Sequence, residues 1–322
     1  MIQQVTFDEV GGPEVLRLIE TTMPAPGPGE VLLRQTAVGL NFIDTYHRTG
    51  LYPVPLPSGV GLEAAGIIEA VGAGVVLTPG TRVGYCWGPI GAYASHRVIP
   101  ADRVVVLPAG VSDEVAAAGM LKGCTAEFLV ERCARVQPGQ WALVQAAAGG
   151  VGLLLVQWLK HVGATVIAVA GSADKVTLAL AHGADHGIVQ GPTQAQQVRD
   201  LTGGRGVDVV FDGVGKATFE ASLDSLVRRG LHISYGNASG AVGPVDFAIL
   251  ARKGSLFVTR PTLFDYYATR SEIEIHAGRV LDLIATGVIK VNVDQRYALR
   301  DAAQAHRDLE ARRTTGSTIL VP

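Results

Sequence analysis

The chain has 322 residues, of which 48% are hydrophobic and 17% are charged, and its formal net charge is -2 at pH 7. This length exceeds what a single hydrophobic core usually serves, so we expect two domains, and the composition excludes a long disordered tail. The near-neutral charge provides no basic field for nucleic acid or anionic lipid, so we expect neither partner.

The N-terminal third of the chain is predicted to form a mostly antiparallel β domain. Short segments rich in Val and Ile alternate there with turns such as "PGPGE", "TPG" and "LPAG". The expected strand segments are "EVLLRQTAVGLN", "AAGIIEAVGAGV", "GTRVGYC", "GAYASHRVI" and "DRVVVLP". The N-terminus lacks the order of a signal peptide, and no apolar run approaches the roughly 20 residues that span a bilayer, so we expect a cytoplasmic protein away from membranes.

From about Trp141 to Arg260, β-branched runs alternate with helical stretches. This regularity predicts parallel strands joined by right-handed crossovers, hence an open doubly wound sheet. Gly163, Gly183 and Gly203 end the first three helices, and each suits the left-handed cap position. The expected strands are 141–146, 165–170, 187–190, 207–212, 231–236 and 255–260, and the expected helices are 151–163, 172–183 and 192–204.

After Arg260, residues 270–287 are predicted to be helical, and the final "STILVP" is predicted to be a strand that returns to the β domain. We therefore predict an α/β protein with a discontinuous catalytic domain, residues 1–125 and 262–322, and an inserted nucleotide-binding domain, residues 126–261.

A glycine cluster, Gly149, Gly150 and Gly152, stands immediately before a helix of bulky apolar residues. In a dinucleotide fold, such a turn lets backbone amides approach the pyrophosphate at the positive end of the helix. The spacing Ala147-x-Gly149-x-x-Gly152 fits this turn, with alanine at the first glycine position. The alternative is that the glycines only permit close helix–sheet packing, but the βα units that follow favour a phosphate cradle.

The second strand of this domain ends without the carboxylate that an NAD enzyme uses to hold the ribose 2′-hydroxyl. Ala170, Gly171 and Ser172 stand there instead, and Ser172 and Lys175 suit a 2′-phosphate. We therefore expect NADPH rather than NADH. The alternatives are an ordinary helix N-cap for Ser172 and a solvated lysine for Lys175.

The three cysteines, Cys86, Cys124 and Cys133, are an odd number at wide spacing. This argues against a disulfide framework and against a four-thiolate zinc site. We expect small buried thiols.

The segments quoted above, with others given at the end of this paragraph, span nearly the full length of the chain. Through them the chain resembles the zinc-independent quinone oxidoreductases of the medium-chain dehydrogenase/reductase superfamily, which include zeta-crystallin and bacterial NADPH:quinone reductases. The resemblance implies a chaperonin-10-like β-rich catalytic domain, a Rossmann domain, and reduction of a quinone in the interdomain cleft. It also implies a dimer or a tetramer; strand 255–260 could pair across a twofold axis, and we expect a homodimer. The matching segments are "GGPEVL", "GLNFIDTYHRTGLYP", "GLEAAGIIEAVGAGV", "GAYASH", "LKGCTAEFL", "AAAGGVGLLLVQWLK", "VDVVFDGVG", "SYGNASG", "GSLFVTRPTL" and "GSTILVP".

The same resemblance bears on metals. Aligned with the motifs of the zinc-containing relatives, two ligand positions fall on Asn41 and Leu62. Because leucine cannot ligate a metal, we expect no zinc. Glu63 and Asp44 remain in these motifs, and we expect them to be structural ion-pair or turn residues.

Without a metal or an evident nucleophile, the expected chemistry is direct hydride transfer from the nicotinamide, helped by hydrogen-bond donors near the substrate oxygen. The resemblance implies that Asn41, Tyr46 and Tyr52 lie in a loop facing the nicotinamide, and we expect these three with Arg260 to be the catalytic group. A tyrosine suits a flat quinone, because its ring can stack and its hydroxyl can donate. His47, one residue further on, is expected to be exposed.

The resemblance also implies a set of cofactor contacts. For Lys122 and Arg260 a plain salt bridge is the alternative, and Gln190 replaces a tyrosine of close bacterial relatives, which bears on the NADPH preference. The expected contacts are Asn41, Lys122, Thr125, Gly149, Gly150, Val151, Gly171, Ser172, Lys175, Gln190, Gly236, Asn237, Arg260, Pro261 and Arg312.

Two other functions stay open at this point. An NADPH-dependent reductase of the C=C bond of α,β-unsaturated aldehydes or ketones needs the same fold, cofactor and oxygen-side donors. A non-catalytic crystallin-type protein that binds NADPH and RNA is the second alternative, and the lack of a basic stripe weighs against it.

Overall fold

The computed structural model describes the whole chain, Met1–Pro322. The chain divides into two compact units: unit 1 is Met1–Cys124 with Tyr267–Pro322, and unit 2 is Thr125–Tyr266. The predicted domain boundaries, after residues 125 and 261, stay a prediction. No helix of the chain is long and apolar enough to cross a membrane.

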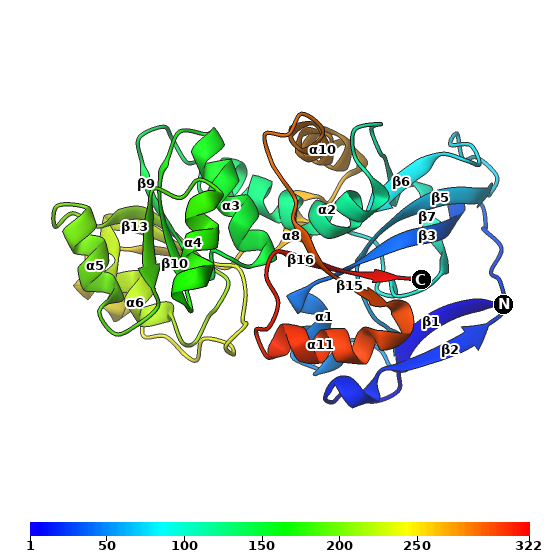
Figure 1. Cartoon of the computed structure of the whole chain (residues 1–322), viewed down its shortest axis with the longest axis horizontal. Helices are drawn as coiled ribbons and strands as arrows, with labels where there is room; N and C mark the ends of the chain where they lie inside the picture. The colour runs from blue at the N-terminus through cyan, green and yellow to red at the C-terminus, as the bar shows by residue number, and fades with distance from the viewer. The chain divides into compact units, whose positions relative to one another are not determined.

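Unit 1 is built on a seven-stranded sheet in the order β15-β16-β3-β5-β6-β8, with β7 also paired to β3. All of its pairs are antiparallel except β15 with β16. A three-stranded sheet, β2-β1-β4, completes the unit (Figure 1). The strands are β1 Ile2–Phe7, β2 Arg17–Thr21, β3 Glu30–Leu40, β4 Ser58–Gly59, β5 Glu63–Val71, β6 Arg82–Tyr85, β7 His96–Pro100, β8 Val105–Val106, β15 Val293–Ala298 and β16 Ser317–Val321.

Helices of unit 1 are short, and only α2 continues into unit 2. The strand β16 pairs with β3, so the final segment returns to the β-rich unit as predicted. The helical segments are η1 Pro13–Val15, α1 Phe42–Arg48, η2 Ala101–Arg103, α2 Asp113–Glu127, α9 Arg270–Glu272, η4 Ile273–Ala277, α10 Gly278–Ala285, η5 Leu299–Asp301 and α11 Ala302–Glu310.

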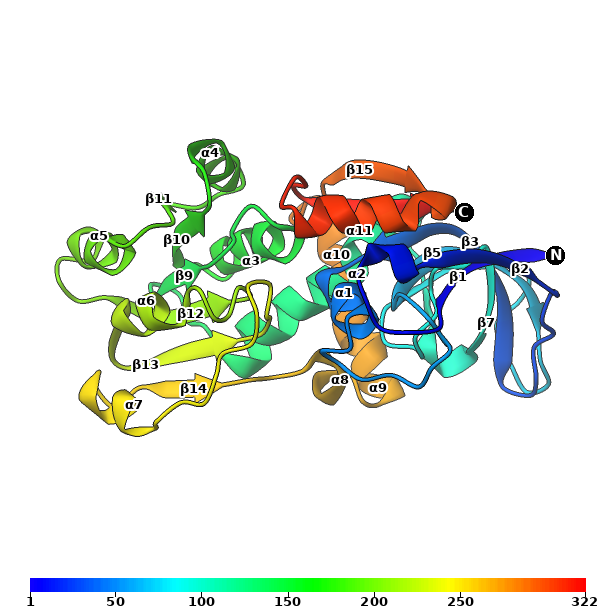
Figure 2. The ribbon, with the colours of Figure 1, turned by 90° about the horizontal axis from the view of Figure 1, so that it is seen from below.

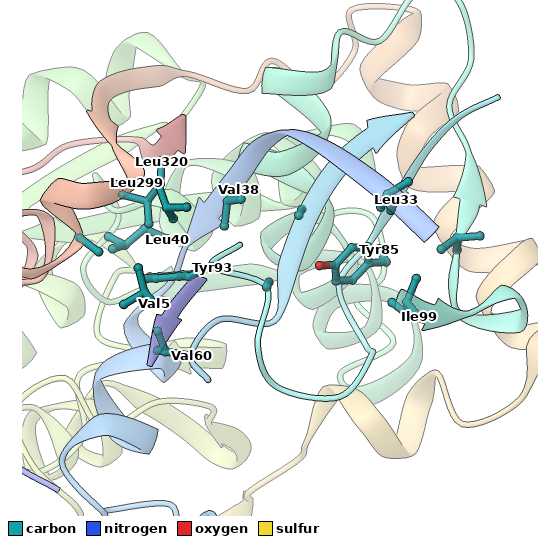
Figure 3. Close-up of a cluster of buried hydrophobic side chains, with 14 of the residues drawn as sticks. Val5, Leu33, Val38, Leu40, Val60, Tyr85, Tyr93, Ile99, Leu299 and Leu320 are labelled. Atoms are coloured by element: carbon teal, nitrogen blue, oxygen red, sulfur yellow. The ribbon is translucent and has the colours of Figure 1, made fainter. Parts of the chain in front are cut away.

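The core of unit 1 lies around the central strand β3. Leu33, Val38 and Leu40 of β3 are buried with residues from strands far away in the sequence, including Leu320 of β16. Figure 3 shows these side chains with Tyr93, which lies close to Leu40. Burial of this apolar surface is the main source of stability for the unit.

Unit 2 is a six-stranded parallel sheet in the order β11-β10-β9-β12-β13-β14 (Figure 2). Its central strands read as nearly continuous apolar runs, as expected for a sheet buried on both faces. The elements are η3 Phe128–Cys133, β9 Trp141–Val144, α3 Gly150–His161, β10 Thr165–Ala170, α4 Ala173–Ala181, β11 His186–Val189, α5 Gln194–Leu201, β12 Val207–Asp212, α6 Phe219–Asp224, β13 Leu226–Ser234, α7 Ala248–Arg252, β14 Phe257–Thr259 and α8 Leu263–Tyr266.

The predicted fold class is confirmed: a mostly antiparallel β unit is combined with a Rossmann-like parallel sheet. The predicted helix caps are confirmed as well. The φ angles of Gly163, Gly183 and Gly203 are 84°, 106° and 62°, all in the left-handed region.

Close packing of α3 on its sheet depends on Gly152. A Cβ at this position would lie 2.4 Å from the carbonyl oxygen of Ala146 and 2.7 Å from the Cα of Ala147. Both are backbone atoms, so the helix would have to shift. The packing role that the sequence offered as an alternative therefore holds for this glycine.

Replacing Gly152 by alanine should lower the free energy of unfolding by about 1 to 3 kcal/mol, because the added methyl group meets backbone. Chemical denaturation would measure the change. Gly278→Ala is the matched control, since a Cβ there has no heavy atom within 4 Å. Equal stability of the two variants would show that α3 can move without cost.

Candidate functional site

The predicted cofactor residues of unit 2 follow its strands. Gly149 comes after β9, Gly171 after β10, Gln190 after β11, Gly236 after β13 and Arg260 after β14. Because the carboxyl ends of parallel strands meet at one edge of a sheet, the fold places all of these residues along that edge. Figure 1 shows the strands β9, β10 and β13 of this sheet. This edge is where open α/β sheets bind their ligands.

The turn after β9 leaves room for a phosphate. Gly149 is the N-cap of α3 with φ -79° and ψ 169°, and a Cβ there would meet only the Ala146 carbonyl oxygen, at 3.3 Å. The first N–H groups of α3, from Gly150 and Val151, have no intrahelical partner, and they add to the positive end of the helix dipole. A Cβ at position 149 would thus make one tight contact with backbone, a much milder conflict than at Gly152, and the turn fits the close approach of a pyrophosphate.

Ser172 and Lys175 lie in one turn at the start of α4. The Ser172 hydroxyl accepts a hydrogen bond from the backbone N–H of Lys175 at 3.4 Å, so Ser172 is the helix N-cap that the sequence offered as its alternative role. Ser172 and the neighbouring Gly171 are exposed, and a Cβ on Gly171 would have open space. A 2′-phosphate could therefore reach this turn while the cap is kept.

Asp212, at the end of β12, is a site residue that the sequence reasoning missed. Its carboxylate is fully buried and accepts hydrogen bonds from the hydroxyls of Thr218 and Ser222, at 2.8 to 2.9 Å, and from His232 Nε2 at 3.4 Å. Burial alone would raise the pKa of Asp212, but these bonds and the backbone N–H of Gly215 hold that pKa below its usual value. Asp212 is therefore a buried anion with a full set of donors.

The Asp212 carboxylate also shapes the loop that follows it, through the N–H groups of Val214 and Gly215 at 2.9 and 3.1 Å. This loop lies against the segment after β13: the N–H of Ala238 donates to the Gly213 carbonyl at 3.2 Å. A Cβ on Gly236 would stand 2.4 Å from that carbonyl, so only glycine permits the approach. Asp212 thereby holds the segment that carries the predicted contacts Gly236 and Asn237.

The remaining predicted residues of unit 2 are Thr125, Arg260 and Pro261. Thr125 is buried near the end of α2. Arg260 is exposed, and its Nη1 donates to the Ser234 carbonyl at 2.9 Å. This bond ties Arg260, which follows β14, to the end of β13.

In unit 1 the segment expected to be a loop is a helix, so that expectation was wrong. Phe42–Arg48 forms α1, with Asn41 as its N-cap, and the Asp44 carboxylate accepts the backbone N–H of Asn41 at 2.9 Å. This reciprocal capping starts a helix that lacks strong helix formers. Burial raises the pKa of Asp44 to about 7, against the hydrogen bonds that it accepts from Asn41 and Tyr93.

The predicted tyrosines lie close together at α1. Tyr46 is buried on the helix and Tyr52 is half-buried after it, with ring centroids 5.2 Å apart in an edge contact. His47 is also buried, 7% exposed, so the expectation of an exposed histidine was wrong. Its Nδ1 has no hydrogen-bond partner, and burial lowers its pKa. The ring of Tyr52 lies 6.2 Å from that of His47, so aromatic packing covers the histidine.

Lys122 lies in the buried ion pair that the sequence offered as its alternative. Its Nζ is 3.6 Å from Glu63 Oε2, and both side chains are almost fully buried. The same carboxylate accepts Asn41 Nδ2 at 2.7 Å and the backbone N–H of Leu121 at 2.6 Å. Burial raises the pKa of Glu63. The charge of Lys122 and the hydrogen bonds from Asn41 and Leu121 oppose this rise. Glu63 is therefore a structural ion-pair residue, and it orients the Asn41 amide.

Arg312 is exposed in the residues that follow α11, and its φ is 58°. Its backbone N–H donates to the Leu309 carbonyl at 3.1 Å. The fold thus places Arg312 at a tight turn on the surface of unit 1.

Residues 27–109 match the model described as "Alcohol dehydrogenase GroES-like domain", and residues 150–271 match "Zinc-binding dehydrogenase". The quinone oxidoreductase of Pseudomonas aeruginosa is 47% identical over the full length of both chains. A crystal structure of Escherichia coli quinone oxidoreductase with NADPH has a TM-score of 0.97 and 47% identity, covering 99% of this chain and 100% of that one. The chain belongs to the quinone oxidoreductase family.

This membership confirms the predicted family within the medium-chain dehydrogenase/reductase superfamily. The family also has a member of other specificity: the 2-haloacrylate reductase of a Burkholderia species is 42% identical, over 100% of this chain and 99% of that protein. The chain is therefore also similar to a protein named for a second substrate class, the haloacrylates.

The metal ligands of zinc-containing dehydrogenases are not reproduced in this member of the quinone oxidoreductase family. No group of three or more His, Cys, Asp or Glu side chains is placed to hold a metal ion. Leu62 and Asn41, which the resemblance aligns with two ligand positions of zinc-containing relatives, are both buried. Cys86 and Cys124 are buried free thiols as expected, while Cys133 is only half-buried. The expectation that no zinc binds stays a prediction.

Proposed function

We propose that this chain is an NADPH-dependent quinone oxidoreductase. The observation that carries the proposal is the likeness, over nearly the full length of both chains, to a quinone oxidoreductase crystallised with NADPH. The room at Gly149 and the carboxylate-free end of β10 support the same cofactor. Bound NADPH would supply the hydride that a quinone accepts.

We assign the cofactor to the carboxyl edge of the unit 2 sheet. The N–H groups of Gly150 and Val151 hold the pyrophosphate, and Ser172 with Lys175 holds the 2′-phosphate. We assign no cofactor contact to Lys122, because its charge is already paired with the Glu63 carboxylate. The other proposed contacts are Asn41, Thr125, Gly149, Gly171, Gln190, Gly236, Asn237, Arg260, Pro261 and Arg312.

On the substrate side we propose Tyr46, Tyr52 and Arg260 as hydrogen-bond donors to the quinone oxygen, where negative charge develops. Asn41 has a different task. Its Nδ2 donates to Glu63 and its Oδ1 caps the backbone N–H of Asp44, which leaves one lone pair of Oδ1 to accept a ribose hydroxyl. These residues orient the reactants and need no metal step.

A second candidate is reduction of a C=C bond conjugated to a carbonyl or carboxyl group. The match to the 2-haloacrylate reductase favours it, since a haloacrylate carries such a bond. Turnover of NADPH with 9,10-phenanthrenequinone, 2-octenal and 2-chloroacrylate as acceptors separates the candidates. Quinone as the best acceptor supports the proposal, and turnover confined to the two unsaturated acceptors would replace it with the second candidate.

Cofactor choice should change with Ser172→Asp, which keeps a good N-cap residue while placing a carboxylate where NAD enzymes carry one. We expect the KM for NADPH to rise about tenfold or more, with the KM for NADH within about threefold, because repulsion acts only on the 2′-phosphate. Lys175→Ala should shift the ratio in the same direction. Steady-state kinetics with both cofactors measures the effect.

The control for this experiment is Lys253→Ala. Lys253 comes before β14, so it lies at the amino ends of the strands and not at the carboxyl ends. It should leave the NADPH to NADH ratio unchanged. The 2′-phosphate assignment fails if Ser172→Asp and Lys175→Ala also leave that ratio unchanged.

We also propose a homodimer in the cytoplasm. The strand β14 is an edge of the unit 2 sheet, and its Phe257 and Val258 are 60% and 39% exposed, which suits pairing with a second copy. The three free cysteines suit a reducing compartment. Light scattering on the purified protein tests the dimer, and a monomer at micromolar concentration would rule it out.

A further inference from the structure

A chain of buried polar side chains runs through unit 1 from α11 to the start of α1. His306 Nε2 is 3.1 Å from the Tyr93 hydroxyl, and this hydroxyl donates to Asp44 Oδ2 at 2.9 Å. At the other end, Arg48 Nη1 is 3.0 Å from His306 Nδ1. Each of these four side chains is at most 1% exposed.

The far end of this chain is fixed in place. Arg48 donates from Nε to the Gly11 carbonyl at 3.0 Å and from its two terminal nitrogens to Glu310 at 3.0 and 2.7 Å. A fully buried guanidinium with a carboxylate partner and a carbonyl partner has one orientation. His306 therefore faces an immobile donor.

This donor sets the direction of every hydrogen bond in the chain. Arginine is always protonated and can only donate, so His306 Nδ1 must accept and its proton must be on Nε2. The Nε2–H then donates to the Tyr93 oxygen, which leaves the single Tyr93 proton for Asp44 Oδ2. Burial, together with the charge of Arg48, lowers the pKa of His306 to about 3, so the ring stays neutral and this arrangement holds at neutral pH.

The chain ends at the proposed substrate helix. Asp44 Oδ2 accepts both the Tyr93 hydroxyl and the backbone N–H of Asn41, the latter at 2.9 Å. With two donors on Oδ2, a proton bound by Asp44 belongs on Oδ1, which has no partner. The carboxyl therefore has one defined orientation, and Asn41 is held between Asp44 and Glu63.

Packing keeps this arrangement rigid. Tyr93 lies in the apolar core of unit 1, close to Val5 and Leu40 (Figure 3). Its ring also contacts that of His306, with centroids 5.8 Å apart at an angle of 81°. An apolar pair of similar volume in place of Tyr93 and His306 would fill the same core without the cost of buried polar groups. The polar side chains of Tyr93 and His306 are thus better explained by the orientation that their hydrogen bonds impose than by a gain in the free energy of unfolding.

We propose that His306 is a positioning residue for the reaction: through Tyr93 it fixes the Asp44 carboxyl, and through Asp44 the backbone N–H of Asn41, and with it the place of this residue at the start of α1. The inference rests on the proposed function, in which Asn41 contacts the cofactor ribose. It assigns a role in turnover to the C-terminal helix α11, which carries no residue of the proposed site.

The test compares His306→Gln with His306→Leu and Tyr93→Phe. Glutamine can accept from Arg48 through Oε1 and donate to Tyr93 through Nε2, whereas leucine can do neither. We expect kcat for quinone reduction to fall about tenfold or more in His306→Leu and Tyr93→Phe, because small displacements of positioned groups are costly. His306→Gln should restore most of kcat, and NADPH affinity, assigned mainly to unit 2, should stay within about threefold in all three.

Signals in NMR spectra give a readout that does not depend on activity. In the wild type, His306 should show a protonated Nε2 and an unprotonated Nδ1 with no titration across about pH 5 to 8. The Asn41 side-chain amide signal should move in His306→Leu and return in His306→Gln. A titrating His306, an unmoved Asn41 signal, or equal kcat in the leucine and glutamine variants would overturn the proposal. A wild type without quinone turnover but with these NMR results would refute the function and keep the positioning.

Discussion

Replacing Gly149 by valine should weaken NADPH binding about a hundredfold, roughly 3 kcal/mol, while the protein stays folded. The backbone at Gly149 is extended, so its φ and ψ suit any residue, and a Cβ would make one tight contact, 3.3 Å from the Ala146 carbonyl oxygen. The branched side chain would instead fill the room that we assign to the pyrophosphate. Because valine is a poor N-cap residue, a loss of about 1 kcal/mol of stability is expected as well.

Titration of NADPH by fluorescence, beside thermal unfolding, measures both effects of Gly149→Val. Gly278→Ala again serves as the control, since it adds a side chain in open space within unit 1. NADPH binding of normal affinity by a folded Gly149→Val variant would show that the turn after β9 does not hold the cofactor.

Replacing Asp212 by alanine should lower the free energy of unfolding by about 3 to 5 kcal/mol. The change leaves His232, Thr218 and Ser222 buried without their shared acceptor, together with two backbone N–H groups. NADPH affinity should fall as well, because the segment with Gly236 loses its support.

Chemical denaturation of Asp212→Ala beside Asp224→Ala separates this network from an ordinary surface charge. Asp224 is a half-exposed partner of Lys253, and its loss should cost at most about 1 kcal/mol. If the two variants are equally stable, the buried network does not stabilise unit 2, and the account of the Gly236 segment is wrong.

Features that repeat locally along the sequence were predictable. The parallel sheet of unit 2 follows from runs such as Val207–Asp212, and the helix ends follow from Gly163, Gly183 and Gly203, because each depends on residues within a few positions. The position of Gly149, Gly171, Gln190, Gly236 and Arg260 at the carboxyl ends of the strands also follows, since each comes shortly after a strand.

Features that depend on distant partners were not predictable. The network of Asp212 needs His232, 20 residues away, and the chain from Asp44 needs His306, contributed by the C-terminal helix. The helix α1 was missed because "FIDTYHR" has weak helix propensity, and its start depends on the capping pair Asn41 and Asp44. The burial of His47 was not predicted, because we took its seven-residue segment as a loop, and a loop has no face that is expected to be buried.

We infer that this protein transfers reducing equivalents from NADPH to a quinone with its own side chains and without a metal ion. The most direct measurement is the rate of NADPH absorbance loss with 1,4-benzoquinone, using protein treated with a chelator and, at NADPH concentrations far below its weakened affinity, Gly149→Val as the reference of low activity. We predict turnover by the wild type that survives chelation, exceeds that with NADH, and is much lower in the variant. No turnover above the rate of the variant, or turnover that requires added zinc, would contradict the account.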